Sequence, residues 1–240
     1  MLCPFAERAL LTLLFKGVPH QAVHVDRCEK PSWFVDLCKI EGLPDDVPNI
    51  ELHGRVRASG KDSCRWICEN FRGQGTTDLK YSNRQDKQQV DTLVQACLGF
   101  IKAGLNLLAG NDSRGLWQIG TGQTQAQWKA FEQELEAFQD AIKESGGPFL
   151  LGSEVSLADL IYMPFMERFA IAMPAFTPYD PCAACDGLMA DWLWEMEQLE
   201  CCQIAAPDHD LYLQAIRQWR SLEFYKHNTF EAFQLHPHLQ

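Results

Sequence analysis

The stretch FLLGSEVSLADLIYMPFMERF, residues 149–169, decides the fold class because it combines a helix start with a long apolar run. Ser156 and Asp159 form an S-x-x-D pattern, in which the two side chains satisfy backbone N–H groups at a helix N-terminus. Pro164 lies inside the apolar run, lacks an N–H donor and is expected to kink the helix. The pattern therefore predicts a helix of the core that begins near Ser156.

Residues on both sides of this stretch also follow a helical period. From Thr124 to Glu144, apolar side chains recur at spacings of three and four, as one buried face of a helix requires. This stripe consists of Trp128, Phe131, Leu135, Phe138 and Ile142. Two more helices are expected over residues 187–200 and 208–221. The C-terminal half is therefore predicted to be an all-α helical bundle.

The first 72 residues mix helical and extended patterns. Prolines mark helix starts, glycines mark helix ends, and a short β-branched run marks a strand. The expected elements are a helix over residues 3–16, a strand over 21–25, a helix over 31–42, a hairpin that turns at His53 and Gly54, and a helix capped by Ser59 and Asp62. The polar, turn-rich residues 73–86 are expected to be a linker. The chain thus divides into an α/β domain at 1–72 and an all-α domain at 87–240.

Cys3 stands where the first helix begins, directly before Pro4. Proline suits the first turn of a helix because its missing N–H would lack an intrahelical partner in any case. Unpaired backbone N–H groups and the positive end of the helix dipole stabilise a thiolate, so the pKa of Cys3 is expected below the free value of roughly 8.5. Cys3 is therefore a candidate nucleophile, although a small apolar residue at a helix start is the simpler interpretation.

Composition restricts the function classes. The 240 residues are 46% hydrophobic and 22% charged, which is ordinary for a globular protein with one large or two modest cores. The net charge of −11 opposes binding to nucleic acid or to an anionic membrane surface. No run reaches the roughly 18 apolar residues of a membrane helix, and the N-terminus lacks the layout of a signal peptide. We therefore expect a soluble, intracellular protein.

The ten cysteines are expected to be reduced thiols, because the chain is long and carries no secretion signal. Cys182 and Cys185 precede Cys201, Cys202 and His209, which at first suggests a metal site. Zinc sites use spaced pairs, however, and adjacent cysteines are expected to diverge. We therefore expect no metal.

Six segments occur in the order that is typical of the soluble glutathione transferases. They are CPFAERALLTLLFKGVP, KPSWF, DVPNIELHG, FLLGSEVSLADLIYMPFMERF, YD at 179–180 and WLWEMEQLE. Over nearly its whole length the chain resembles the cysteine-type members of this family, closest to the lambda class and related to the omega class and the dehydroascorbate reductases. The resemblance implies the glutathione-transferase fold, with a thioredoxin-like N-terminal domain followed by a helical C-terminal domain.

The resemblance also implies which residues carry the chemistry. Cys3 matches the catalytic cysteine, and Pro4 and Phe5 lie beside it in the motif. Val47 matches the residue whose backbone pairs with the cysteinyl unit of glutathione, and Pro48 matches the cis-proline that presents it. Without the resemblance, Pro48 would be taken for a trans proline at the start of a strand.

Three features depart from the family pattern. The Glu-Ser pair that holds the glutamyl end of glutathione aligns with Ser59 and Gly60, where Ser59 and the following helix N-terminus can still meet a carboxylate. Asp46 stands where the family often has a basic residue, which places a negative charge near an anionic tripeptide. The family's first strand has no counterpart before Cys3, so we expect the sequence to come from an N-terminally truncated gene.

The residues around Cys3 restrict the reaction. Ala6 completes a C-x-x-A motif, so no resolving cysteine lies one helical turn away. Cys3 is expected to attack sulfur and form a mixed disulfide with glutathione, which a second glutathione releases. The expected activity is thiol transfer, deglutathionylation or dehydroascorbate reduction, with glutathione as co-substrate and a small-molecule or glutathionylated acceptor.

Two other functions stay open. Weakened glutathione contacts also suit a non-catalytic ligand carrier or interaction module. Membrane-inserting relatives of the chloride-channel type share the C-P-F motif, but the C-terminal resemblance favours the transferases. The lambda resemblance implies a monomer, located in the cytoplasm or, if a transit peptide precedes the sequence, in a plastid.

Overall fold

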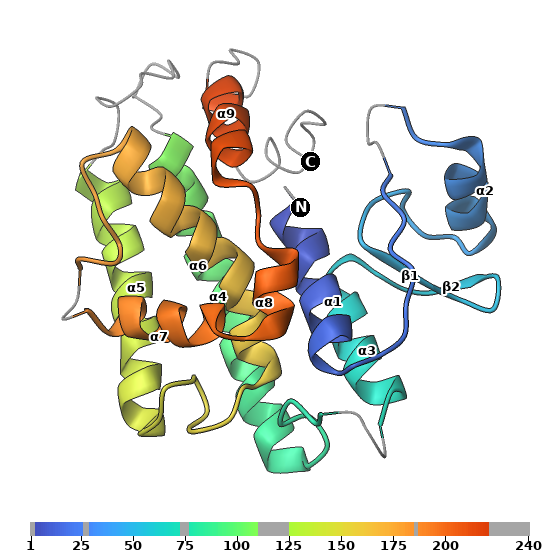
Figure 1. Cartoon of the computed structure of the whole chain (residues 1–240), viewed down its shortest axis with the longest axis horizontal. Coiled ribbons are helices and arrows are strands. Elements are labelled where there is room, and N and C mark those ends of the chain that lie inside the picture. The colour runs from blue at the N-terminus through green and yellow to red at the C-terminus, as the bar shows by residue number, and fades with distance from the viewer. Residues whose placement is uncertain (1–2, 26–28, 73–76, 110–124, 185–186, 221–240) are drawn as a thin grey trace.

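A computed structural model gives two groups of elements on either side of helix α1 (Figure 1). It describes residues 3–25, 29–72, 77–109, 125–184 and 187–220. The N-terminal group consists of α1 (Pro4–Phe15), α2 (Ser32–Ile40), β1 (Asn49–Leu52), β2 (Arg55–Ser59), the short 3-10 helix η1 (Gly60–Asp62) and α3 (Ser63–Asn70). The C-terminal group consists of α4 (Arg84–Ala109), α5 (Gln125–Ser145), α6 (Leu157–Phe176), α7 (Leu188–Glu197), α8 (Glu200–Ala205) and α9 (His209–Arg220).

Helix α1 forms where the sequence predicts it. Cys3 is the N-cap residue, and its carbonyl accepts the first helical hydrogen bond from the Glu7 N–H at 3.1 Å. Gly17 adopts a φ of 63°, the left-handed conformation that commonly follows a helix C-terminus. The helix packs against α3 on one side and against α6 and α8 on the other. It therefore joins the two groups of elements.

The predicted hairpin is also confirmed. Strands β1 and β2 pair antiparallel, with Asn49 opposite Ser59. The turn residues His53 and Gly54 both have positive φ, at 57° and 77°, as a two-residue hairpin turn of type I′ requires. The pairing brings the residues before β1 next to the residues after β2.

Two local predictions in the N-terminal group are wrong. Residues 21–25 form no strand, because a strand needs a hydrogen-bonded neighbour and β1 and β2 are the only strands in the described part of the chain. Ser59 and Asp62 form no capping box. Within the described residues the Ser59 side chain makes no capping hydrogen bond, because the η1 turn separates Ser59 from α3.

Helix α6 lies at the centre of the helical group, as its sequence predicts. The capping box at its start is present, with the Asp159 carboxylate accepting hydrogen bonds from the Ser156 N–H at 2.8 Å and the Ser156 hydroxyl at 2.6 Å. The same carboxylate accepts from the Leu150 N–H and from the indole N–H of Trp192, both at 2.9 Å. Asp159 therefore joins the start of α6 to the preceding loop and to α7.

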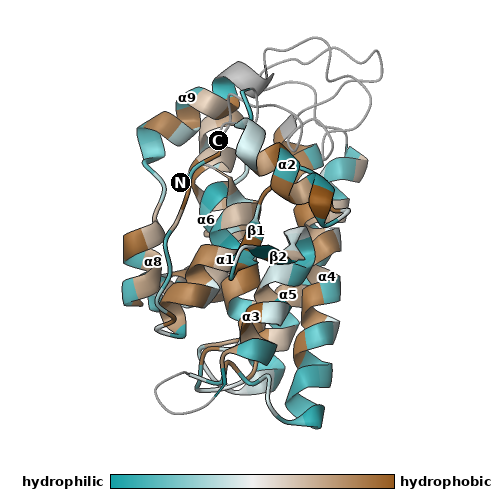
Figure 2. Cartoon of the chain, turned by 90° about the vertical axis from the view of Figure 1, so that its right-hand side faces the viewer, coloured by the Kyte–Doolittle hydropathy of each residue, from teal (hydrophilic) through white to brown (hydrophobic). Residues whose placement is uncertain are grey.

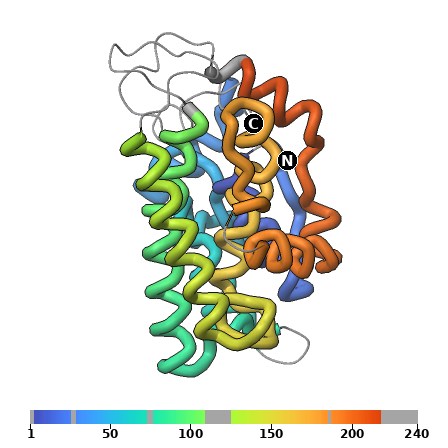
Figure 3. Tube along the Cα trace, turned by 90° about the vertical axis from the view of Figure 1, so that its left-hand side faces the viewer, coloured from blue at the N-terminus to red at the C-terminus, as the bar shows by residue number. Residues whose placement is uncertain are grey.

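The helices around α6 bury the predicted apolar stripe. Helices α4 and α5 lie side by side (Figure 3), and four of the five stripe residues of α5 are buried, while Trp128 is partly buried. The first half of α4 is largely hydrophilic in Figure 2. Among the described residues, no helix combines the length and the apolar character needed to cross a bilayer. Part of the predicted linker at 73–86 lies outside the described residues, and the division into domains stays a prediction.

A buried ion pair connects the two groups. The Arg168 guanidinium of α6 donates to the Glu7 carboxylate of α1 at 2.5 Å, and the two side chains are 1% and 2% exposed. Arg168 also donates to the Pro164 carbonyl at 2.8 Å and stacks over the Tyr212 ring of α9. Next to this pair, the Phe5 and Phe165 rings meet edge to face at 5.0 Å. The contact fixes how α1 lies against the bundle.

We predict that Glu7→Leu lowers the free energy of unfolding by about 3–5 kcal/mol, because it leaves the Arg168 charge buried without its partner. Adding Arg168→Met should restore most of that loss, because it removes the stranded charge. Urea unfolding of the two single variants and the double variant measures the coupling. Additive losses in the double variant would contradict a direct pairing.

Candidate functional site

The candidate nucleophile lies at the N-terminus of α1. Cys3 is partly exposed and has extended backbone angles, with φ −80° and ψ 110°. Pro4 is buried as the first residue of the helix, and Phe5 is partly buried against Phe165. Cys3 stands at the N-terminus of a 12-residue helix, where backbone N–H groups without intrahelical partners and the helix dipole favour a negative charge, although its side chain makes no capping hydrogen bond within the described part of the chain.

A second group of predicted site residues meets at the base of the hairpin. The Val47–Pro48 peptide bond is cis, as the resemblance implies. The Pro48 carbonyl accepts a hydrogen bond from the Gly60 N–H at 2.7 Å, and Ser59 lies opposite Asn49. Gly60 has a φ of 54°, a left-handed conformation that favours glycine. Val47, Pro48, Ser59 and Gly60 are therefore brought together.

The two groups are linked through the packing of α1. Helix α1 contacts η1, which begins at Gly60, and contacts α3, which follows η1. The buried Ser63 hydroxyl at the start of α3 donates to the Pro48 carbonyl at 3.5 Å, which connects α3 to the proline turn. The helix that carries Cys3 therefore rests on the elements that hold the proline turn.

Asp46 accepts a hydrogen bond from a backbone N–H group that the family resemblance assigns to glutathione binding. Its carboxylate accepts a hydrogen bond from the Val47 N–H at 2.9 Å. The sequence had indicated only an unfavourable charge at Asp46. Aspartate commonly accepts hydrogen bonds from neighbouring backbone N–H groups, so the hydrogen bond from Val47 to Asp46 could have been predicted from the sequence.

A buried cation near the start of α1, Arg8, was not predicted from the sequence. Arg8 is 6% exposed, and its guanidinium lies over the Phe5 and Phe165 rings at 5.1 and 5.5 Å from their centroids. Its Nε has no hydrogen-bond partner among the described residues. The sequence did contain an indication of this buried charge, because Glu7 and Arg8 are adjacent charged residues in a largely apolar helix.

Comparisons with known proteins show the family of this chain. The profile of the family described as "Glutathione S-transferase, C-terminal domain" matches residues 121–193. "Protein IN2-1" of Zea mays is 30% identical over 200 residues, which cover 82% of this chain and 74% of that protein. "Glutathione S-transferase L2, chloroplastic" of Arabidopsis thaliana is also 30% identical, over 201 residues and 82% of this chain. The chain belongs to the glutathione S-transferase family. It spans 61% of the length of that Arabidopsis relative.

Solved structures show the same transferase fold. Glutathione transferase Omega 3C from Trametes versicolor superposes with a TM-score of 0.70, at 23% identity and with 86% of each chain covered. The fold is therefore that of the glutathione transferases, with a helical C-terminal part. The comparisons leave the roles of Cys3 and of the hairpin residues as predictions.

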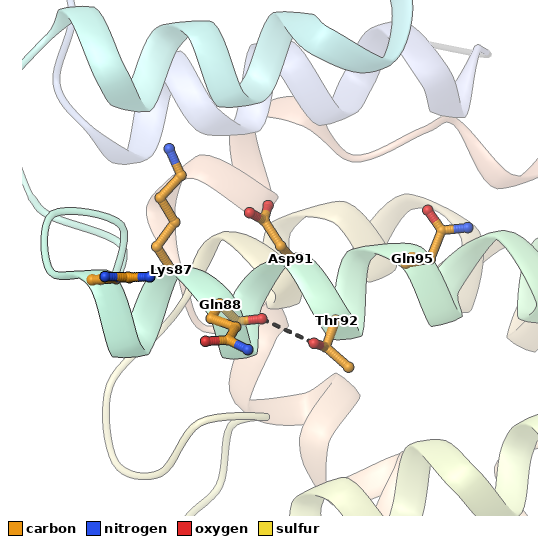
Figure 4. Close-up of a pocket in the computed structure, with 6 residues that line it drawn as sticks. Lys87, Gln88, Asp91, Thr92 and Gln95 are labelled. Atoms are coloured by element: carbon orange, nitrogen blue, oxygen red, sulfur yellow. Dashed lines mark hydrogen bonds between the residues drawn. The ribbon is translucent and has the colours of Figure 1, made fainter.

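A surface depression of about 540 Å³ in the described residues lies elsewhere. It is lined by residues of the first half of α4 and contains none of the predicted site residues (Figure 4). Lys87 and Asp91 on this face pair with Glu69 and Arg65 of α3. The Thr92 hydroxyl donates to the Gln88 carbonyl at 2.9 Å. Two ion pairs on this side of α4 therefore link it to α3.

Two adjacent cysteines differ from expectation. The sulfur atoms of Cys201 and Cys202 lie 3.9 Å apart in α8, although adjacent cysteines were expected to diverge. Both residues are buried, at 5% exposure each. Across the described residues, no three His, Cys, Asp or Glu side chains gather in a way that could hold a metal ion.

A second carboxyl group lies beside the buried ion pair. Burial, followed by the nearby charge of Glu7, raises the pKa of Glu167 to about 8, although Arg168 opposes the rise. The Glu167 carboxyl lies 3.9 Å from the Arg168 guanidinium, and more remote Glu197 acts in the same direction as Glu7. Glu167 is therefore mostly protonated at neutral pH.

We predict that this protonation makes stability depend on pH. Between the ordinary glutamate pKa, near 4.3, and about pH 8, the folded protein holds a proton that the unfolded chain has released. Raising the pH from 6 to 9 should therefore lower the free energy of unfolding by roughly 2–3 kcal/mol. Glu167→Gln should remove most of this loss in urea unfolding at the two pH values.

Glu197→Gln is the matched control, because Glu197 is an exposed glutamate of α7 near the same cluster. It should keep most of the pH dependence of the unchanged protein, because Glu197 contributes less than burial and Glu7 to the raised pKa of Glu167. An equal loss of stability in Glu167→Gln and the unchanged protein would assign the effect to other groups.

Proposed function

We propose that this chain is a glutathione-dependent thiol transferase that uses Cys3 as its single catalytic cysteine. The observation that carries the proposal is the position of Cys3 at the N-cap of α1, directly before Pro4. Aligned peptide dipoles at a helix N-terminus favour a thiolate, and the thiolate is the nucleophilic form of cysteine. The Arabidopsis relative and the transferase fold support glutathione as the co-substrate.

The proposed reaction is a two-step exchange. The Cys3 thiolate attacks the glutathione sulfur of a glutathionylated acceptor, which forms the Cys3–glutathione disulfide and releases the acceptor as a thiolate that takes up a proton. A second glutathione, as its thiolate, attacks the sulfur of this disulfide that came from glutathione. Glutathione disulfide leaves, and the Cys3 thiolate is restored. With dehydroascorbate as acceptor, two glutathione molecules supply the two electrons and two protons that form ascorbate.

The hairpin residues are proposed to hold glutathione. The backbone of Val47, before cis Pro48, would pair with the cysteinyl unit, and Ser59 and Gly60 would meet the glutamyl carboxylate. Their hydrogen-bonded arrangement beside η1 supports this assignment, because it keeps these backbone groups together at one end of the hairpin. We expect the reaction to take place in the cytoplasm or in a plastid.

A non-catalytic carrier is the second candidate. It is favoured by the Asp46 carboxylate, which occupies the Val47 N–H and brings a negative charge to the proposed site. Serine and glycine at positions 59 and 60, in place of the Glu-Ser pair that the resemblance leads us to expect, point in the same direction. The carrier would bind ligands without sulfur exchange.

We predict that Cys3→Ser lowers kcat/KM for the glutathione-dependent reduction of a small mixed disulfide by about 100-fold or more, because a hydroxyl cannot form the mixed disulfide. Initial rates at varied concentrations of both substrates should fit ping-pong kinetics. Cys182→Ser is the control, since Cys182 is the other partly exposed described cysteine and lies outside the proposed site. Equal turnover in Cys3→Ser, or none in either protein, would favour the carrier.

We also predict that Asp46→Ala lowers KM for glutathione about two- to tenfold, because it releases one backbone donor and removes a negative charge. Asp45→Ala is the matched control. It removes an equal charge one residue away, where Asp45 pairs with Lys30 at 2.9 Å. An unchanged or higher KM in Asp46→Ala, or an equal decrease in both variants, would argue against a role for the Val47 N–H.

A further inference from the structure

The adjacent thiols of Cys201 and Cys202 are a feature that sulfur exchange at Cys3 does not use. Neighbouring residues on an α-helix point about 100° apart, which normally separates their side chains. Here the Cys202 N–H bonds to the Leu199 carbonyl at 3.0 Å, three residues back, so the first turn of α8 is tight. The two sulfur atoms lie 3.9 Å apart and are within hydrogen-bonding distance.

The distance between the two sulfur atoms restricts which bonds and ligands the pair can form. A disulfide bond needs sulfur atoms about 2.05 Å apart, so the pair would have to close by nearly half within one helical turn. A structural zinc ion needs about four ligands, and the described residues supply no third donor to this pair. An atom that bonds to two sulfurs and keeps a third, organic substituent needs only these two thiols.

We propose that Cys201 and Cys202 form a binding site for trivalent organoarsenic compounds of the type R–As(OH)₂, a class of soft, thiol-seeking ligand. Each thiol sulfur forms one bond to arsenic, and each arsenic–oxygen bond that breaks releases a hydroxide. The two S–H protons leave with these hydroxides as two water molecules. Arsenic stays trivalent, so the step needs no oxidant or reductant.

The surroundings of the pair favour a neutral ligand. Both cysteines are buried, and the nearby carboxyl groups of Glu167 and Glu7 contribute to raising the pKa of Cys202, after its hydrogen bond to Cys201 and its burial. Burial of both thiols opposes a charged reagent such as glutathione, because a charge loses its hydration there. The arsenic exchange starts and ends with uncharged species, so it adds no charge to the buried site.

The short helix α8 offers a route by which the ligand enters. The helix has six residues, and Ile204 within it is 60% exposed. Short surface helices open locally at a lower free-energy cost than core helices such as α6. A small aromatic arsenical can therefore reach thiols that are closed in the resting structure.

The test uses phenylarsine oxide with the full chain under reducing conditions. Intact mass spectrometry should find one phenylarsenic adduct per chain that survives excess glutathione and is removed by 2,3-dimercaptopropanol, because only a dithiol competes with a two-sulfur site. Proteolysis of the modified protein should locate the adduct on the peptide that contains residues 200–205. No retained adduct, an adventitious adduct only, or an adduct on another peptide would overturn the proposal.

Single substitutions provide a second, independent readout. Cys201→Ala and Cys202→Ala should each abolish the retained adduct, because a single thiol exchanges its arsenic to glutathione. Cys64→Ala and Cys68→Ala are the matched controls, since these thiols are buried four residues apart in α3 and should leave the adduct unchanged. Persistence of the adduct in either α8 variant would contradict the site. If a variant fails to fold, the peptide location in the unchanged protein decides alone.

Cys3→Ser separates this site from the proposed function. The retained adduct should be unaffected by that substitution, whether or not sulfur exchange at Cys3 occurs. Loss of the adduct in Cys3→Ser would assign arsenic binding to the α1 thiol and overturn the proposal, while leaving the proposed thiol transfer intact.

Discussion

The buried ion pair between Glu7 and Arg168 is the contact on which the arrangement of this chain depends. It joins side chains 161 residues apart, one from α1 and one from α6. Two charges removed from water are tolerated only when they stay together, so the pair allows little freedom in how α1 lies on the bundle. The Phe5 and Phe165 rings next to it add apolar contact at the same junction. An ion pair and an aromatic contact therefore both hold helix α1 against the bundle.

This junction matters for function because α1 also carries Cys3. A thiol at a helix N-terminus is useful for sulfur exchange only if the helix holds a constant position relative to the groups that bind the substrate. Those groups belong to a different element, the hairpin that follows cis Pro48. Helix α1 meets that hairpin through η1 and α3 and meets the bundle through α6 and α8. The packing of one helix therefore relates the proposed nucleophile to its proposed binding groups.

Local signals in the sequence predicted much of the fold. The S-x-x-D pattern at Ser156 predicted the start of α6, and the three-and-four spacing predicted α5. The turn at His53 and Gly54 was predictable because its conformation depends on the residues within it. The predicted strand at 21–25 was wrong because strand formation depends on more than local residues. β-Branched residues form a strand only beside a pairing partner. The predicted capping box at Ser59 was wrong because the chain forms a 3-10 turn before α3.

The sequence by itself determined most of the helices, though not the bounds of α4 or the separate helix α8. It also determined the hairpin turn and the position of Cys3 before Pro4, because these features depend on neighbours within a few residues. The family resemblance added the cis bond before Pro48, which composition and spacing do not show. Only the tertiary structure decided that Glu7 meets Arg168 and that Asp46 takes the Val47 N–H. It also decided that the Cys201 and Cys202 sulfurs approach to 3.9 Å. These contacts depend on side-chain directions and on burial by distant segments, which the order of residues does not specify locally.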